Sequence, residues 1–205
     1  MESFLPGPVG HQASNRLTSV AAPTRSIRIV VTGSESTGKT TLSRQLAEAL
    51  HAVWIPEYAR AYAETVGRPL LAGDVEKIAR GQIAGEDVAI AGGPPLVVQD
   101  TDLLSTVVYA RHYYGASPAW IDAVAAQRVG SLYLLCDIDL AWVGDGVRDR
   151  PFDRQLLDSL FRTTLAEFGA VVAAVSGSGA RRLHDALDRI DAWRAAHDPA
   201  SDSSP

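Results

Sequence analysis

The stretch from Ile27 to Leu50 constrains the fold of this chain more than any other part of the sequence. An apolar, β-branched run over residues 27–32 leads into a loop, and a helical pattern of apolar residues follows. The loop reads Gly33-Ser34-Glu35-Ser36-Thr37-Gly38-Lys39-Thr40. This is the order of strand, G-x-x-x-x-G-K-[ST] motif and helix that defines a phosphate-binding P-loop. Glycine is needed at both ends of the motif, because a β-carbon would block the backbone angles and the close approach of a phosphate.

Each polar group of this loop has a role in holding phosphates. Backbone N–H groups and the positive end of the following helix point at one anion. Lys39 supplies a positive charge for the outer phosphates, and the Thr40 hydroxyl can ligate Mg²⁺. An ordinary Gly/Ser turn is the alternative, which the flanking strand and helix disfavour. We predict that ATP binds here through Gly33, Ser34, Glu35, Ser36, Thr37, Gly38, Lys39, Thr40 and Thr41.

Length and composition set limits on the domain organisation and the partners. A chain of 205 residues suits one domain with a sizeable core. We expect a flexible segment at 1–25, a P-loop domain at 26–196 and a flexible tail at 197–205. The net charge of −5 gives no basic footprint, so nucleic acid is not an expected partner. Oligomeric state cannot be read from these features.

The single cysteine and the short apolar runs exclude further classes of protein. Cys136 alone cannot form an intramolecular disulfide framework or a cysteine-based zinc cluster, and its apolar surroundings predict a buried thiol. No apolar run approaches the roughly 18–20 residues of a membrane span. The N-terminus lacks the charged start and apolar core of a secretory signal. We therefore expect a cytoplasmic protein with no membrane partner.

Two acidic residues follow predicted strands near the P-loop. Glu57 comes after a short strand at 52–55 that Pro56 ends, and Asp100 comes after the apolar run Leu96–Val98. Ligands in open α/β sheets bind outside the carboxyl ends of the strands, so both acids are placed for chemistry. We interpret Asp100 as an acid that holds Mg²⁺ directly or through water. Either acid can serve as general base; we favour Glu57, for which a solvated loop acid is the alternative.

A second informative segment covers residues 137–151. It holds glycines that permit movement and two arginines two positions apart, Arg148 and Arg150. Arginine forks match phosphate oxygens bidentately, and a lid over the phosphates expels water. We predict a lid whose two arginines contact the ATP phosphates, with Arg148 closing on the transferred group. The alternative is an exposed loop whose arginines and aspartates pair with one another.

Five short apolar segments alternate with helical patterns along the chain. They lie at about 27–32, 52–55, 96–99, 131–136 and 170–175, and a last helix extends to about Trp193. This alternation predicts a parallel sheet covered on both faces, with right-handed crossovers. The fold class is therefore α/β, a three-layer P-loop domain with a lid segment.

From Ile27 to about Trp193, the sequence resembles the ribosylnicotinamide kinase domain of the bacterial NadR proteins. The resemblance rests on the P-loop, on Pro56-Glu57-Tyr58-Ala59-Arg60, on Asp100-Thr101-Asp102, and on Trp142, Asp145-Gly146 and Arg148. It implies the strand order 2-3-1-4-5 and a kinase that uses ATP and Mg²⁺. It also implies substrate contacts from Glu57, Tyr58, Arg60, Asp100 and Trp142. The nucleotidyltransferase domain of NadR proteins has no counterpart in the sequence, so adenylyl transfer and repression are not expected.

The expected activity is transfer of the γ-phosphoryl group of ATP to the ribose 5′-hydroxyl of nicotinamide riboside. Tyr58 and Trp142 would flank the substrate ring, because a cationic pyridinium sits well on an aromatic face. Two alternatives remain open: a kinase for another nucleoside or a vitamin alcohol, and a nucleotide-driven switch that orders residues 137–151 for a protein or lipid partner. The absence of an N-K-x-D motif from the sequence argues against a GTPase switch.

Overall fold

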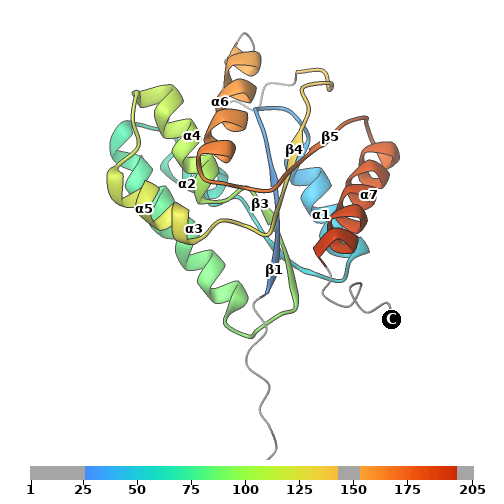
Figure 1. Cartoon of the computed structure of the whole chain (residues 1–205). Coiled ribbons are helices and arrows are strands. Elements are labelled where there is room, and N and C mark those ends of the chain that lie inside the picture. Colours follow the sequence, from blue (N-terminus) through green and yellow to red (C-terminus); the bar gives the residue numbers. More distant parts are fainter. Residues whose placement is uncertain (1–25, 143–152, 198–205) are drawn as a thin grey trace, which may run out of the picture.

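The computed structural model describes residues 26–142 and 153–197, and these form one parallel sheet with helices on both faces (Figure 1). The sheet has five strands in the order β2-β3-β1-β4-β5. Its strands are β1 (Ile27–Thr32), β2 (Val53–Ile55), β3 (Leu96–Asp100), β4 (Leu132–Cys136) and β5 (Val172–Val175). This confirms the predicted three-layer α/β fold and its strand order.

The helices differ from the sequence prediction at two places. They are α1 (Lys39–Ala49), α2 (Tyr58–Val66), α3 (Val75–Ile90), α4 (Leu103–Tyr114), α5 (Ala119–Gln127), α6 (Arg154–Glu167) and α7 (Ala180–His197), with a short 3₁₀ turn at Ala72–Asp74. Helix α2 directly after Glu57 was not foreseen, and α7 runs past Trp193 to His197. In the described ranges 26–142 and 153–197, no helix is long and apolar enough to cross a membrane.

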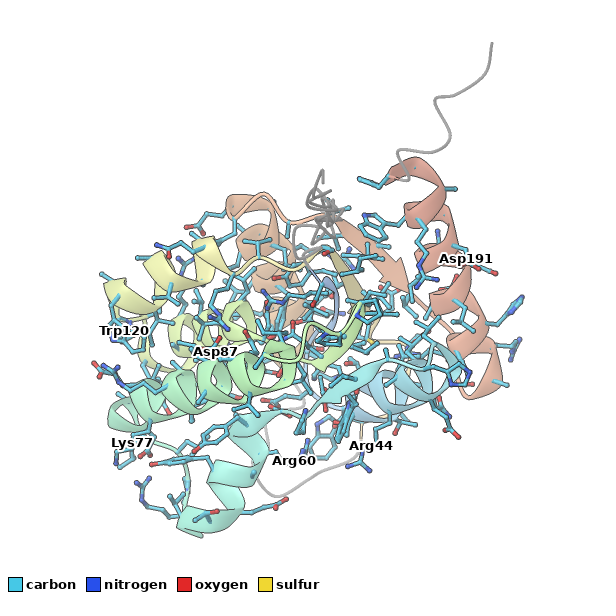
Figure 2. All side chains as sticks on the ribbon, turned by 90° about the horizontal axis from the view of Figure 1, so that it is seen from below. Arg44, Arg60, Lys77, Asp87, Trp120 and Asp191 are labelled. Atoms are coloured by element: carbon cyan, nitrogen blue, oxygen red, sulfur yellow. The ribbon has the colours of Figure 1, made fainter. Side chains whose placement is uncertain are left out.

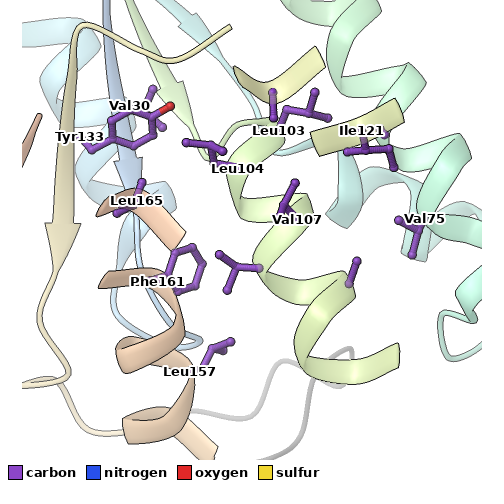
Figure 3. Packing of buried hydrophobic residues seen from close by; sticks show 14 of the residues in the cluster. Val30, Val75, Leu103, Leu104, Val107, Ile121, Tyr133, Leu157, Phe161 and Leu165 are labelled. Carbon is purple, nitrogen blue, oxygen red and sulfur yellow. The ribbon is translucent and has the colours of Figure 1, made fainter. Parts of the chain in front are cut away.

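The two faces of the sheet bury separate hydrophobic cores, because successive side chains of a strand point to opposite faces. In β1, Val30 faces helices α3, α4, α5 and α6, whereas Ile29 and Val31 face α1 and α7. Figure 3 shows the first core, where Phe161 of α6 packs toward α4. Charged side chains such as Lys77, Asp87 and Asp191 instead lie on the exposed periphery (Figure 2).

Cys136 ends β4 inside the second core. Its side chain is fully buried, and burial raises the pKa of the thiol to about 11. The thiolate is the reactive form of cysteine, so this residue acts as a small buried hydrophobic group. The prediction of a buried thiol is confirmed.

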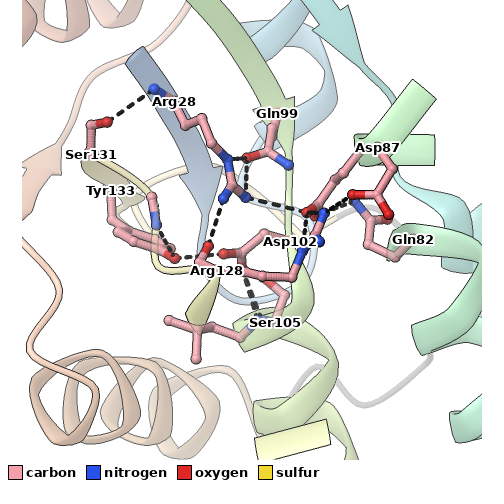
Figure 4. Close-up of polar contacts among 12 residues, drawn as sticks. Arg28, Gln82, Asp87, Gln99, Asp102, Ser105, Arg128, Ser131 and Tyr133 are labelled. Carbon is pink, nitrogen blue, oxygen red and sulfur yellow. Dashed lines mark hydrogen bonds and ion pairs between the residues drawn. The ribbon is translucent and has the colours of Figure 1, made fainter. Parts of the chain in front are cut away.

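A buried polar cluster fixes helix α4 against the sheet (Figure 4). Asp102 caps α4, accepting hydrogen bonds from the backbone N–H groups of Leu104 at 3.0 Å and Ser105 at 3.3 Å. The Tyr133 hydroxyl of β4 donates to the other carboxylate oxygen of Asp102 at 2.5 Å. Burial raises the pKa of Asp102 to about 6. The first turn of α4 thereby has a fixed position relative to β3 and β4.

Replacing Asp102 with alanine is expected to lower the free energy of unfolding by about 2–4 kcal/mol. The loss of a helix cap costs about 1 kcal/mol, and the buried Tyr133 hydroxyl loses its acceptor, which costs about 1–3 kcal/mol more. Urea unfolding measures the effect. Asp191→Ala on the exposed side of α7 is the matched control and should change stability by less than about 0.5 kcal/mol. Equal stability of the two variants would contradict the assignment of Asp102 as a structural cap.

Candidate functional site

The P-loop joins β1 to α1 in a conformation that its glycines make possible. Gly33 has φ 134° and Gly38 has φ 76°, values that disfavour residues with a side chain. A β-carbon on Gly33 would lie 2.9 Å from the Cys136 carbonyl oxygen. Gly38 is the N-cap of α1 and has no side chain with which to cap it. The first N–H groups of α1 are therefore left for an anion, as the sequence predicts.

Side chains of the P-loop hold its backbone carbonyls. The Lys39 ammonium donates to the Ser34 carbonyl oxygen at 2.7 Å, and the Thr37 hydroxyl donates to the same oxygen at 2.8 Å. Glu35 is buried and accepts a hydrogen bond from the Tyr113 hydroxyl of α4 at 2.5 Å. The Glu35 side chain therefore ties the loop to α4, and what it can offer a phosphate is its backbone N–H.

Asp100, Thr40, Glu57 and Lys39 come together at the carboxyl ends of the strands. Asp100 is 1% exposed, and β3 pairs with β1 so that Asp100 lies opposite Val31, two residues before the P-loop. Burial raises the pKa of Asp100, and the negative charge of Glu57 raises it further. A hydrogen bond from the Thr40 hydroxyl and the positive charge of Lys39 act in the opposite direction.

This group fits a magnesium ion. Asp100 Oδ1 is buried and has no hydrogen-bond partner within the described residues, and the Thr40 hydroxyl lies beside the carboxylate. Oxygen ligands of this kind suit Mg²⁺. Within 26–142 and 153–197, no group of three or more His, Cys, Asp or Glu residues is arranged so that it could hold a metal ion. Mg²⁺ commonly keeps several waters and binds phosphates together with one or two protein ligands, which here would be Thr40 and Asp100.

A pocket of about 270 Å³ opens beside Glu57. Helices α2, α3 and α4 and the residues that precede α3 build it. Its lining is Glu57, Ala59, Pro69, Leu70, Leu71, Val75, Ile78, Gln82, Thr101, Ser105, Thr106, Tyr109, Ala110, Tyr113 and Tyr114. Glu57 is 7% exposed and lies 3.8 Å from the Arg60 guanidinium. Through Glu57, the pocket therefore adjoins the cluster that also contains Lys39, Thr40 and Asp100. Through the bond between Tyr113 and Glu35, it also adjoins the P-loop itself.

Two residues that we expected beside the substrate ring do not line this pocket. The Tyr58 ring lies over Gly81 of α3, where a β-carbon would come within 2.1 Å of it, and it stacks beside Tyr62. The missing side chain of Gly81 makes the room for that ring, and a contact between Tyr58 and the substrate stays a prediction. Trp142 is 36% exposed at the end of the first described range and does not line the pocket either. Arg148 and Arg150, with most of the predicted lid, lie outside the described residues.

Several pocket residues were missed by the sequence reasoning. Tyr109 and Tyr113 stand four positions apart on α4, and their rings stack with centroids 6.2 Å apart. That spacing puts two rings on one helix face, a signal that could have found them. Thr101 has φ 65°, a strained conformation for a residue with a side chain, and such strain clusters at functional sites. Gln82 gave no signal, because its role depends on how α3 packs against α2.

A second, more open cavity lies at the other side of the P-loop. Its volume is about 400 Å³, and its lining is Asp139, Ser176, Gly177, Ser178, Arg181 and Asp185. These residues belong to the segment after β4, the loop after β5 and the start of α7. Arg182 connects this region to the P-loop, because it donates to the backbone carbonyls of Gly177 and Thr37.

Comparison with known proteins agrees with this geometry. A family model described as an AAA domain matches residues 28–182. This chain belongs to the AAA domain family. Among curated relatives, the trifunctional NAD biosynthesis/regulator protein NadR of Salmonella typhimurium is 28% identical over 150 residues, 68% of this chain and 37% of the relative. NadR of Escherichia coli is 28% identical over 145 residues, 68% of this chain and 35% of that protein. The chain thus spans roughly a third of the length of the curated relatives it matches.

Solved structures with a similar fold include a NadR protein and a thymidylate kinase. A NadR protein in complex with NR superposes with a TM-score of 0.73 at 28% identity, covering 84% of this chain and 53% of that one. Thymidylate kinase from Ehrlichia chaffeensis superposes with a TM-score of 0.61 at 16% identity, covering 82% of this chain and 99% of the kinase. The similarity to NadR proteins is therefore confirmed, and the second match shows the shared α/β fold.

Proposed function

We propose that this protein is an ATP-dependent kinase that transfers the γ-phosphoryl group to the ribose 5′-hydroxyl of nicotinamide riboside. The observation that carries the proposal is the position of Glu57. Its carboxylate belongs to the group around Lys39, Thr40 and Asp100 and also forms part of the wall of the 270 Å³ pocket. The hydroxyl of an acceptor bound in that pocket would therefore reach the phosphates of ATP beside the Glu57 carboxylate.

The lining of the pocket favours a nucleoside over a nucleoside monophosphate. Its polar groups are Glu57, Gln82, hydroxyls and tyrosines, and none of its described lining residues is Lys, Arg or His. A phosphorylated acceptor needs cationic partners, most often arginine forks. A neutral or cationic acceptor does not, and the stacked faces of Tyr109 and Tyr113 suit a pyridinium ring. The crystallised NadR relative bound to NR supports the same acceptor.

The geometry supports a role for each residue of the site. ATP·Mg²⁺ supplies the phosphoryl group and neutralises its charge, and phosphoryl transfer then depends on positioning more than on covalent help from the protein. The P-loop backbone and Lys39 would orient the outer phosphates, while Thr40 and Asp100 would hold the metal. Glu57 accepts the proton of the acceptor hydroxyl as the new O–P bond forms and the bond to the ADP oxygen breaks. The predicted contributions of Arg148 and Arg150 lie outside the described residues and stay part of the proposal.

An acceptor panel tests this function. The protein is incubated with ATP·Mg²⁺ and nicotinamide riboside, adenosine, thymidine, a vitamin alcohol or thymidine monophosphate, and ADP and phosphorylated product are measured. We expect ADP formation that depends on nicotinamide riboside and little with the monophosphate. If only another nucleoside or alcohol were phosphorylated, that compound and not nicotinamide riboside would be the acceptor. Slow ADP formation indifferent to the panel would favour a switch ATPase and contradict the kinase.

Narrowing the pocket should raise the KM for the acceptor and leave the KM for ATP nearly unchanged. Ala59 lines the pocket from α2, so Ala59→Leu is expected to raise the KM for the acceptor roughly tenfold, as an overpacking cost of about 1–2 kcal/mol implies. The KM for ATP should stay within twofold. Ala61→Leu, at an exposed position of the same helix, is the control. Equal acceptor KM values for the two variants would show that the acceptor binds elsewhere.

A further inference from the structure

Arg182 is a buried cation that lies next to the P-loop without belonging to its motif. It stands in the first turn of α7, 145 residues beyond Thr37, and is 3% exposed. Its guanidinium donates to the backbone carbonyls of Thr37, Gly177 at 2.7 Å and Asp137 at 3.3 Å, and to the Asp139 carboxylate. One side chain thus connects the P-loop, the segment after β4 and the loop before α7.

The contact with Thr37 sets the direction of a phosphate-binding group. In a trans peptide the C=O and the N–H of the next residue point in opposite directions. Because the Thr37 carbonyl points at Arg182, the N–H of Gly38 points away from it. Gly38 itself is left-handed, with φ 76°, and successive N–H groups in such a turn form a concave anion site.

Two other carbonyls of the loop also accept hydrogen bonds, one from within the motif and one from outside it. The Ser34 carbonyl accepts from Lys39 and Thr37, and the Ser36 carbonyl accepts from the Arg154 guanidinium at 3.4 Å. Each carbonyl that is bonded outward cannot turn its negative end toward a phosphate. Arg182 is the most buried of these donors from outside the motif, and it contacts the residue directly before Gly38.

We propose that Arg182 is a positioning residue for the nucleotide, which acts through the Thr37 carbonyl to orient the N–H groups of the P-loop toward the phosphates. Arginine suits this task because its planar fork reaches several acceptors at fixed angles, whereas lysine is a point donor. The inference rests on the proposed function only in requiring that a nucleotide binds at the P-loop.

The test compares ATP with inorganic tripolyphosphate, which has no base. Binding of each is measured by isothermal titration calorimetry for the wild type, Arg182→Lys and Arg182→Ala, well below their melting temperatures. We expect both ligands to bind roughly tenfold or more weakly in the Lys variant, because a charge-assisted hydrogen bond is lost. Arg194→Ala, more exposed near the end of the same helix, should bind both as the wild type does. Should the Ala variant fail to fold, the Lys variant, which keeps the charge, decides the result.

Two outcomes would overturn the inference. If the Lys variant bound both ligands as tightly as the wild type, the contact with Thr37 would have no bearing on the phosphates. If it lost affinity for ATP alone, Arg182 would act on the base end through Gly177 instead. Failure of the proposed kinase activity can be distinguished from failure of this inference. In that case the variants would show the expected loss of binding, but no acceptor in the panel would be phosphorylated.

Discussion

Replacing Lys39 with alanine is expected to lower kcat/KM by about 10³-fold while the protein stays folded. Lys39 has the ligand's charge as its functional partner, and removing one preorganised donor to a transferring group costs about that much in rate. Its contact in the structure is the Ser34 carbonyl, which keeps its bond from the Thr37 hydroxyl at 2.8 Å in the variant. The measurement is steady-state ADP formation together with a thermal unfolding curve.

The sequence offers a matched control for this substitution. Lys77 is the only other lysine of the chain, and its side chain is 64% exposed on α3. Lys77→Ala should leave both kcat/KM and the melting temperature nearly unchanged. If Lys39→Ala turned over within threefold of the wild type, the assignment of the P-loop as the phosphate site would be wrong.

The fold could be predicted because its strongest signals are local. Buried parallel strands are continuous apolar runs, and each of the five was expected within about two residues of its observed bounds. Their order in the sheet was not contained in that pattern and came from the resemblance to NadR proteins. The positions of Glu57 and Asp100 could be predicted in turn, because Glu57 follows β2, Asp100 ends β3, and the carboxyl ends of parallel strands meet at one edge.

The pocket could not be predicted, because it depends on how helices pack. Tyr58 stands next to Glu57 in the sequence, yet its ring fills the space left by Gly81 on α3. The bond between Tyr113 and Glu35 joins residues 78 positions apart. Arg182 belongs to no recognisable sequence motif. Contacts of this kind are set by tertiary packing, which no local pattern in the sequence records.

The two acids beside the P-loop should respond differently to conservative substitution. Glu57→Gln keeps the size of the side chain but removes the proton acceptor, so kcat should fall by about 10²–10⁴-fold with ATP·Mg²⁺ affinity near normal. Asp100→Asn weakens a metal ligand and should raise the Mg²⁺ concentration needed for half-maximal activity. The measurement is kcat across a magnesium titration at saturating nicotinamide riboside. Glu64→Gln, exposed on α2, is the control for a carboxylate change near the pocket.

The structure favours this division of roles on two grounds. Asp100 is the more deeply buried acid and lies on the strand paired with β1, with the Thr40 hydroxyl bonded to it, as suits a metal ligand. Glu57 lies one strand further out and forms part of the pocket wall, where an acceptor hydroxyl can reach it. The two negative charges also act on each other, since Glu57 raises the pKa of Asp100, so a bound Mg²⁺ would relieve both. Rescue of Glu57→Gln by excess magnesium, with no rescue of Asp100→Asn, would show that the roles are reversed.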